Sequence, residues 1–219
     1  MARNKYPEQT VDKIVEVSLR LFMEKGYDHT TVQDIVDRLG GLTKGAVYHH
    51  FKGKEDIFDA VLDRLFSARE ADLTAIVRDR TLSGRDKLRR MMTFSLQDPA
   101  QDQLFTIAPS LSANDRLLSA QLLQVQEIAR DYIEPAIREG IADGSVRAEH
   151  PAALAELFLL ASNFGLNPLI FDITPAQMAE KIAFCRGWLA LYGLEDLIDD
   201  TAERRLIHYC ELVAETRAK

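Results

Sequence analysis

The sequence contains few of the features that mark disulfide-stabilised, secreted or membrane-spanning proteins. Two cysteines, Cys185 and Cys210, occur in 219 residues, which are too few for a disulfide framework. Both lie in apolar, helix-like sequence and are best interpreted as buried, inert thiols. No apolar run approaches the ~18 residues of a membrane span, and the N-terminus lacks the continuous apolar core of a secretory signal. We therefore expect a soluble cytoplasmic protein.

The chain also lacks the excess of positive charge that nucleic-acid-binding proteins usually carry. Its formal net charge is -7, but residues 1–56 hold nine Lys and Arg against nine Asp and Glu and sum to zero. From Leu42 to Lys54 there is no acid, while three lysines, two histidines and a tyrosine gather there. Electrostatic contacts act over about a Debye length of ~10 Å, so this local cluster matters more than the total charge.

Signatures of catalysis and of metal binding are missing as well. The sequence contains no G-x-S-x-G, P-loop or dinucleotide-binding fingerprint. Its five histidines show no metal-ligand spacing with cysteines or carboxylates. We therefore predict that the protein is not an enzyme and carries neither cofactor nor metal.

Helical periodicity dominates what is present, and no period-2 strand, internal repeat or low-complexity tract appears. Pro7 and Gly26 suit the start and end of a first helix. Thr31, with an acid three residues on, is a cap for a second helix, and Thr43 can cap a short third one. Further helices are expected over about 54–80, 84–96, 101–110, 114–142, 151–168, 175–192 and 195–216. The predicted fold class is all-α.

The second and third helices form a helix-turn-helix pattern that is interrupted at Gly40–Gly41. On a helix, Val47 and Phe51 share one side as core residues, beside Ile35 and Phe22. The opposite side carries Gly45, Tyr48, His49 and Lys52. Glycine is costly inside a helix, but an exposed one lets another backbone approach closely, and a major groove admits a helix of this size. A solvated face with ordinary surface lysines is the plain alternative, and it explains the glycine and the aromatic residues less well.

The segment TVQDIVDRLGGLTKGAVYHHFKGKEDIFDAVLD resembles the DNA-binding segment of TetR-family transcriptional regulators. The run from Thr43 to Phe51, followed by Lys54 and Glu55, matches the family's pattern S/T-K-G-x-hydrophobic-Y-x-H-F-x-x-K-E in order and spacing. The resemblance covers roughly residues 8–65. There is one departure, because the turn in LGGLTK has one residue more than is usual. We expect glycine to absorb it, with a tilt of the third helix that alters which base pairs it meets.

The resemblance implies a DNA-binding domain at 1–53 and a ligand-binding and dimerisation domain at 54–219, joined by the helix from 54 to about 80. It implies a repressor that binds a palindromic double-stranded operator as a homodimer and is released by a small, mainly apolar effector. The residues it assigns to DNA binding are Thr31, Thr43, Lys44, Gly45, Tyr48, His49, His50 and Lys54. Among these the threonines, His50 and Lys54 would contact the DNA backbone, whereas the others would face the groove.

The second domain offers an apolar cavity among helices as the place for an effector. Candidate lining residues are Met91, Met92, Phe94, Leu104, Phe105, Leu122, Gln126, Phe158, Asn163 and Trp188, each of which could equally be plain core. Two strongly apolar segments, 151–168 and 175–192, would pack as an intersubunit bundle, as the resemblance implies. The alternative for them is a second core layer within one chain. We predict a homodimer through residues 151–192, and we expect a charge at Leu157 or Leu189 to break dimerisation or folding.

Two other functions remain open from the sequence. A helical enzyme or carrier could keep the helix-turn-helix as scaffold, although a scaffold has no need of Gly45 or of an acid-free run. A protein-interaction module is supported by the acidic second domain alone.

Overall fold

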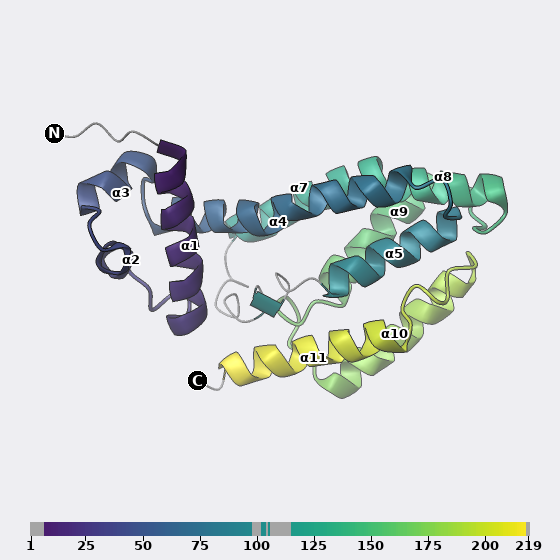
Figure 1. Ribbon diagram of the computed structural model, residues 1–219. Helices are drawn as coiled ribbons and strands as arrows, with labels where there is room; N and C mark the ends of the chain where they lie inside the picture. Colours follow the sequence, from purple (N-terminus) through teal and green to yellow (C-terminus); the bar gives the residue numbers. More distant parts are fainter. Residues whose placement is uncertain (1–6, 98–101, 104, 106–114, 218–219) are drawn as a thin grey trace.

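The computed structural model describes residues 7–97, 102, 103, 105 and 115–217 of the chain. These residues are helical with no strand among them, which confirms the all-α prediction. In Figure 1 a small group of helices at one end is joined to a longer bundle by a single helix. None of the described helices combines the length and hydropathy that a bilayer-spanning segment needs.

Three helices make up the N-terminal bundle: α1 (Pro7–Lys25), α2 (Val32–Leu39) and α3 (Lys44–His50). The side chains of Phe22, Ile35 and Val47, one from each helix, are fully buried. They form the three-helix core that the periodicity predicts. Gly26 ends α1 with a φ of 80°, a left-handed conformation that favours glycine.

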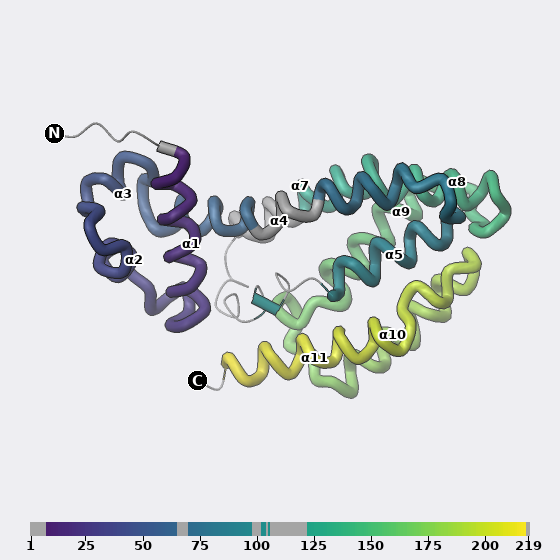
Figure 2. The backbone as a smooth tube through the Cα atoms, in the orientation of Figure 1, coloured from purple at the N-terminus to yellow at the C-terminus, as the bar shows by residue number. Residues whose placement is uncertain are grey.

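Helix α4 (Lys54–Arg78) leaves the bundle and runs into the rest of the protein, a course that can be followed in Figure 2. It packs against α1 and also against α5 (Gly84–Gln97). The rings of Phe58 on α4 and Phe22 on α1 lie 5.8 Å apart in an edge-on arrangement. Because α4 belongs to both groups of helices, a domain boundary after residue 53 stays a prediction.

The longer bundle, which we call the helical body, contains α5 and the elements that follow it. These are α7 (Asp115–Ile128), the π-helical turn η2 (Ala129–Ile133), α8 (Glu134–Asp143), α9 (Pro151–Leu160), the π-helical turn η3 (Ala161–Gly165), α10 (Pro175–Ala190) and α11 (Asp200–Arg217). From α7 to α8 the chain is one uninterrupted helical stretch, as predicted. Its π-helical turn precedes Pro135, which has no N–H to donate and whose ring disturbs the preceding turn.

Helices α5 and α8 touch backbone to backbone. A Cβ atom on Gly84 would lie 2.1 Å from the backbone nitrogen of Gly140, so only a glycine fits there. Beside this contact Lys87 is 2% exposed, and its ammonium pairs with the Glu139 carboxylate. The Lys87 ammonium also donates to the carbonyl of Val77 at 2.7 Å, which ties the last turn of α4 to the helical body.

Two helix boundaries differ from the sequence prediction. Helix α11 begins at Asp200 instead of 195, because the Asp199 carboxylate accepts the N–H groups of Thr201 at 2.9 Å and Ala202 at 2.8 Å. The apolar residues before it pack as a buried turn and do not extend the helix. The helix predicted to reach residue 168 ends at Gly165, and the helix predicted at 101–110 falls mostly outside the described residues.

The two cysteines are free, and burial raises the pKa of both thiols, that of Cys210 to about 11. Burial therefore disfavours the thiolate, which is the reactive form of cysteine, at both positions.

Candidate nucleic-acid interface

Helix α3 is short, and its ends are held by local contacts. At its start the Thr43 hydroxyl accepts the Ala46 N–H at 3.2 Å, as the predicted cap requires. At its end the Phe51 N–H donates to the carbonyl of Val47 at 3.0 Å. The Val47 side chain is fully buried and that of Phe51 is 8% exposed, so the core fixes the rotation of α3 about its axis.

That rotation presents the predicted face to solvent. Lys44, Gly45 and His49 are exposed, and the Tyr48 side chain is 47% exposed. A Cβ atom on Gly45 would meet only the Thr43 hydroxyl oxygen, at 3.9 Å, so the space above Gly45 is open. His50 is half-buried, with its ring 5.2 Å from that of His49. The face is therefore cationic and aromatic, and at Gly45, which has no side chain, another molecule can approach the backbone closely.

The turn between α2 and α3 accommodates its additional residue through glycine. Gly40 and Gly41 have φ angles of 53° and 113°, in the region that other residues rarely adopt. This agrees with the expectation that glycine absorbs the longer turn.

Thr31 makes a capping box with Asp34 at the start of α2. The Thr31 hydroxyl donates to the Asp34 carboxylate at 2.7 Å, and the Thr31 N–H donates to the same carboxylate at 2.8 Å. The Lys25 ammonium lies 2.8 Å from that carboxylate and, with Thr31, holds its pKa well below the usual range. The Thr31 hydroxyl thus has an intramolecular partner, and its predicted phosphate contact stays a prediction.

Lys54 differs from the other predicted DNA-binding residues in where it points. Its ammonium donates to the carbonyl of Tyr27 at 2.9 Å and lies 4.2 Å from the centre of the Tyr27 ring. The side chain is half-buried, and the predicted contact of Lys54 with the DNA backbone stays a prediction. No local pattern could reveal this contact, because the two residues are far apart in the sequence.

The predicted ligand-binding residues differ in their burial. Met92 and Phe158 are buried, and Phe105 stacks on Tyr209 with ring centres 4.3 Å apart. Trp188 is half-buried, whereas Leu122 and Asn163 are exposed. Residues 98–101, 104 and 106–114 lie outside the described residues, Leu104 among them. The effector-binding residues therefore stay a prediction.

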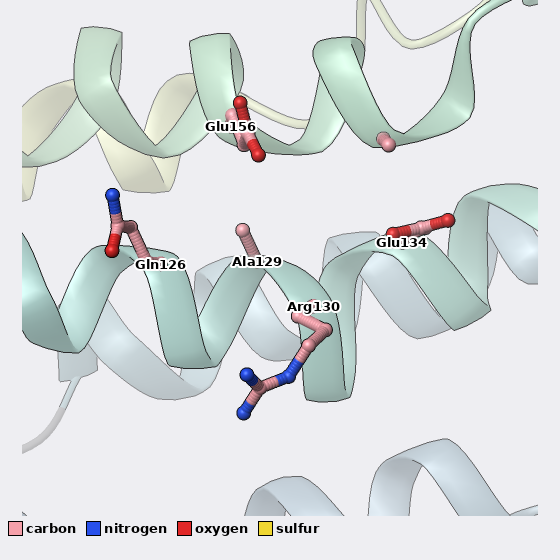
Figure 3. A pocket seen from close by; sticks show the side chains of 6 residues that line it. Gln126, Ala129, Arg130, Glu134 and Glu156 are labelled. Carbon is pink, nitrogen blue, oxygen red and sulfur yellow. The ribbon is translucent and has the colours of Figure 1, made fainter.

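A groove of about 270 Å³ lies between α9 and the stretch formed by α7, η2 and α8. Figure 3 shows Gln126 and Ala129 directed towards α9, with Glu156 opposite and the Arg130 guanidinium turned away. The groove is lined by Gln126, Ala129, Arg130, Glu134, Ala152 and Glu156. Gln126 is the one predicted ligand-binding residue in this lining. The lining is polar and so does not correspond to the apolar cavity expected from the sequence.

Within the described ranges, no group of three or more His, Cys, Asp or Glu side chains is placed to hold a metal ion.

Comparison with known proteins supports a regulatory role. The sequence profile of a family described as "Bacterial regulatory proteins, tetR family" matches residues 14–61, from within α1 into α4. The HTH-type transcriptional repressor KstR2 of Rhodococcus jostii (strain RHA1) is 29% identical over 155 residues, 67% of this chain and 72% of KstR2. The HTH-type transcriptional repressor DhaR of Mycobacterium sp. (strain GP1) is 26% identical over 151 residues, 68% of this chain and 76% of DhaR.

A solved structure extends the likeness into the helical body. The SmeT–triclosan complex is 25% identical and superimposes with a TM-score of 0.56, over 84% of this chain and 92% of the SmeT chain. The likeness in fold therefore covers both groups of helices and not the helix-turn-helix alone.

Proposed function

Because the chain belongs to the tetR family of bacterial regulatory proteins, we propose that it is a transcriptional repressor whose affinity for operator DNA changes when a small molecule binds. The exposed face of α3 carries the proposal. It combines lysine, glycine, tyrosine and histidine on a helix whose other side is locked into the core. The role is regulatory and not catalytic, and it places the protein in the cytoplasm, where the DNA is.

Helix α3 enters the major groove, as recognition helices of helix-turn-helix proteins do. Lys44 and Lys52 contact phosphates, and the bare Gly45 lets the DNA backbone or a base edge approach α3 closely. Tyr48 and His49 supply hydrogen bonds and apolar contact within the groove. Thr31, Thr43 and His50 contact the sugar-phosphate backbone at the edges of this surface.

A homodimer supplies the second copy of α3 that a palindromic operator requires. Helix α10 exposes 76% of Phe184, next to the exposed small residues Ala183 and Gly187. On α9 the Leu157 side chain is 56% exposed. Large apolar side chains left exposed on helices are typical of an interface between subunits. Leu189, by contrast, is 1% exposed and belongs to the core of its own chain, so a charge there would act on folding.

The response to an effector requires a mechanical link, and α4 provides it. Its first turn lies against the N-terminal bundle, and its last turn is bonded to Lys87 of the helical body. SmeT, a relative by fold and sequence, has been solved in complex with triclosan. An effector that prefers one tilt of α4 shifts the repressor between two states by its difference in affinity for them. A coupling of ~1–3 kcal/mol would change operator affinity about 5- to 150-fold.

Selection of DNA by the protein itself tests the proposal. The wild-type protein is incubated with a library of randomised duplexes, and the bound duplexes are sequenced after several rounds. We expect a palindrome, bound by a dimer at micromolar concentration as measured by sedimentation. Recovery of no sequence preference, or a monomer throughout, would refute the proposal. Lys44→Met is the matched variant, and it should lower the salt dependence of binding by about one unit, as loss of one phosphate contact does.

A further inference from the structure

Lys54, the first residue of α4, directs its ammonium group into the protein. The Nζ atom donates to the carbonyl of Tyr27 at 2.9 Å and approaches that of Asp28 at 3.4 Å. The same atom lies 4.2 Å from the centre of the Tyr27 ring, within the range of a cation–π contact. An ammonium group has three donors, and two of them are directed at backbone carbonyls. Lys54 therefore bridges α4 and the turn that joins α1 to α2.

The position of Lys54 makes this bridge significant. A cation in the first turn of a helix is unfavourable because the N-terminal end of the helix carries partial positive charge. Glu55 and Asp56 in the same turn of α4 carry the favourable negative charge, whereas Lys54 carries the unfavourable positive one. The carbonyls of the turn and the Tyr27 ring offset that cost.

Helix α4 holds the Tyr27 ring with two side chains that are one helical turn apart. Phe58 packs against the ring at 4.8 Å between centres, and Lys54 covers it as well. From α1, Phe22 contacts the same ring at 5.4 Å. Burial raises the pKa of Tyr27 to about 12, so the ring facing the ammonium is neutral at physiological pH. Tyr27 is therefore clamped between α1 and α4.

The clamped turn leads directly into the helix that supports α3. Thr30 is fully buried, and its hydroxyl donates to the carbonyl of Gly26 at 2.8 Å. The next residue, Thr31, caps α2, and α2 packs against α3. The contacts from Lys54 to the cap of α2 thus form a short, connected path from α4 to the recognition helix.

We propose that Lys54 is a positioning residue for operator recognition, which sets the orientation of α2 and α3 on α4, and that it is not a phosphate contact. This inference rests on the proposed function, because it assigns a role within DNA binding. Loss of the bridge frees the turn at Tyr27 and lets α3 take several orientations. Binding to the correct sequence then suffers more than binding to DNA in general.

The test compares Lys54→Met with Lys52→Met, a change at an exposed lysine two residues earlier. The probes are the duplex selected by the wild-type protein and a scrambled duplex of the same composition, titrated at several salt concentrations where each variant is folded. For Lys54→Met we expect the ratio of the two affinities to fall by about tenfold or more, with the salt slope unchanged. For Lys52→Met we expect equal weakening on both duplexes and a slope lower by about one unit.

Thermal unfolding provides a readout that needs no DNA. Removal of a charge-assisted hydrogen bond should lower the Tm of Lys54→Met by about 3 °C or more, and leave that of Lys52→Met unchanged. Lys54→Gln keeps a donor without the charge and carries the same test if Lys54→Met does not fold. It should recover part of the lost specificity.

The outcomes separate this inference from the proposed function. Uniform weakening by Lys54→Met with a slope lower by one unit would make Lys54 a phosphate contact and overturn the inference. Unchanged binding and unchanged Tm would overturn it as well. If the wild-type protein selects no DNA sequence, the proposed function fails, while the Tm comparison still decides whether the bridge exists.

Discussion

The exposed face of α3 and the groove beside α9 both lie on the surface, but their residues are held in place differently. The face of α3 is positioned by a cap and two buried side chains within the nine residues from Thr43 to Phe51. The groove combines side chains from Gln126 to Glu156, on helices that meet only through tertiary packing. A surface built from neighbouring residues can be recognised as a sequence pattern, whereas one assembled from distant residues cannot.

The largest effect we expect is from a charge in the packing of the helical body. Leu189→Asp places a carboxylate where the side chain is 1% exposed, at a cost of about 4 kcal/mol or more, which is enough to unfold many domains. We expect no folded protein by circular dichroism. Phe184→Asp, on the same helix but 76% exposed, is the control and should give a folded monomer in sedimentation. If Leu189→Asp also gave a folded monomer, our assignment of Leu189 to the core would be wrong.

Substitutions at two glycines compare the packed helical body with the exposed face of α3, and each adds only a methyl group. Gly84→Ala places a methyl group against the backbone of Gly140 and should destabilise the fold by about 1–3 kcal/mol, as overpacking does. Gly45→Ala adds a methyl group in open space and should leave the stability equal or higher, because alanine favours helix.

Of these two variants, we expect Gly45→Ala and not Gly84→Ala to weaken DNA binding. Gly45→Ala should weaken operator binding, because its methyl group stands on the face that approaches DNA. Gly84→Ala should bind normally at temperatures where it is folded. Urea unfolding and operator titration of both variants provide the measurements. Loss of stability in Gly45→Ala would show that Gly45 does not face open space and so does not differ from the packed Gly84 in this respect.

The sequence was sufficient for the fold class and for most of the helix-turn-helix, because these depend on local signals. Thr31 and Thr43 cap helices in the structure as predicted, and Val47 is buried opposite Tyr48. The start of α11 was missed because apolar residues before Asp199 look like helix but pack as a turn. Long-range contacts gave no signal at all, and Lys54 is the clearest example.

Predictions for the effector site were limited for the same reason, because contacts between residues distant in the sequence leave no local pattern. Met92 and Phe158 are apolar and buried, which is true of core and of cavity lining alike. Gln126, another of the candidates, lines the polar groove beside α9 and not an apolar cavity. Residue type identifies candidates for a cavity, but the packing of the helices decides which of them face it.

A moderate effect is expected at the surface of α3. Tyr48→Ala should weaken binding to the selected duplex by about tenfold, or roughly 1.4 kcal/mol, because its exposed ring no longer contacts DNA. The Tm should remain that of the wild type, since 47% of the side chain is exposed. Mobility-shift titration and thermal unfolding measure the two quantities. Unchanged affinity would remove Tyr48 from the interface.

The smallest effect concerns acid, which should loosen the cap of α2. The Lys25 ammonium and the Thr31 groups hold the pKa of Asp34 below its usual range. A carboxyl group with a lowered pKa in the folded state contributes stability above its unfolded pKa of about 3.9, and loses it as the pH falls further. Asp34→Asn removes this contribution at every pH. The difference in Tm between wild type and variant should therefore be constant from pH 7 to pH 5 and shrink below about pH 4.

Salt provides the control for this last prediction. Asp34 and Lys25 are partly exposed, so ions in solution weaken their attraction. The hydrogen bonds from Thr31 are short and local, and ions affect them less. A Tm difference that shrinks only in part in 1 M salt would assign the remainder to the capping box. Complete loss in salt would assign it to the ion pair with Lys25, and the stability of the cap would then depend on α1 and not on the local sequence of α2.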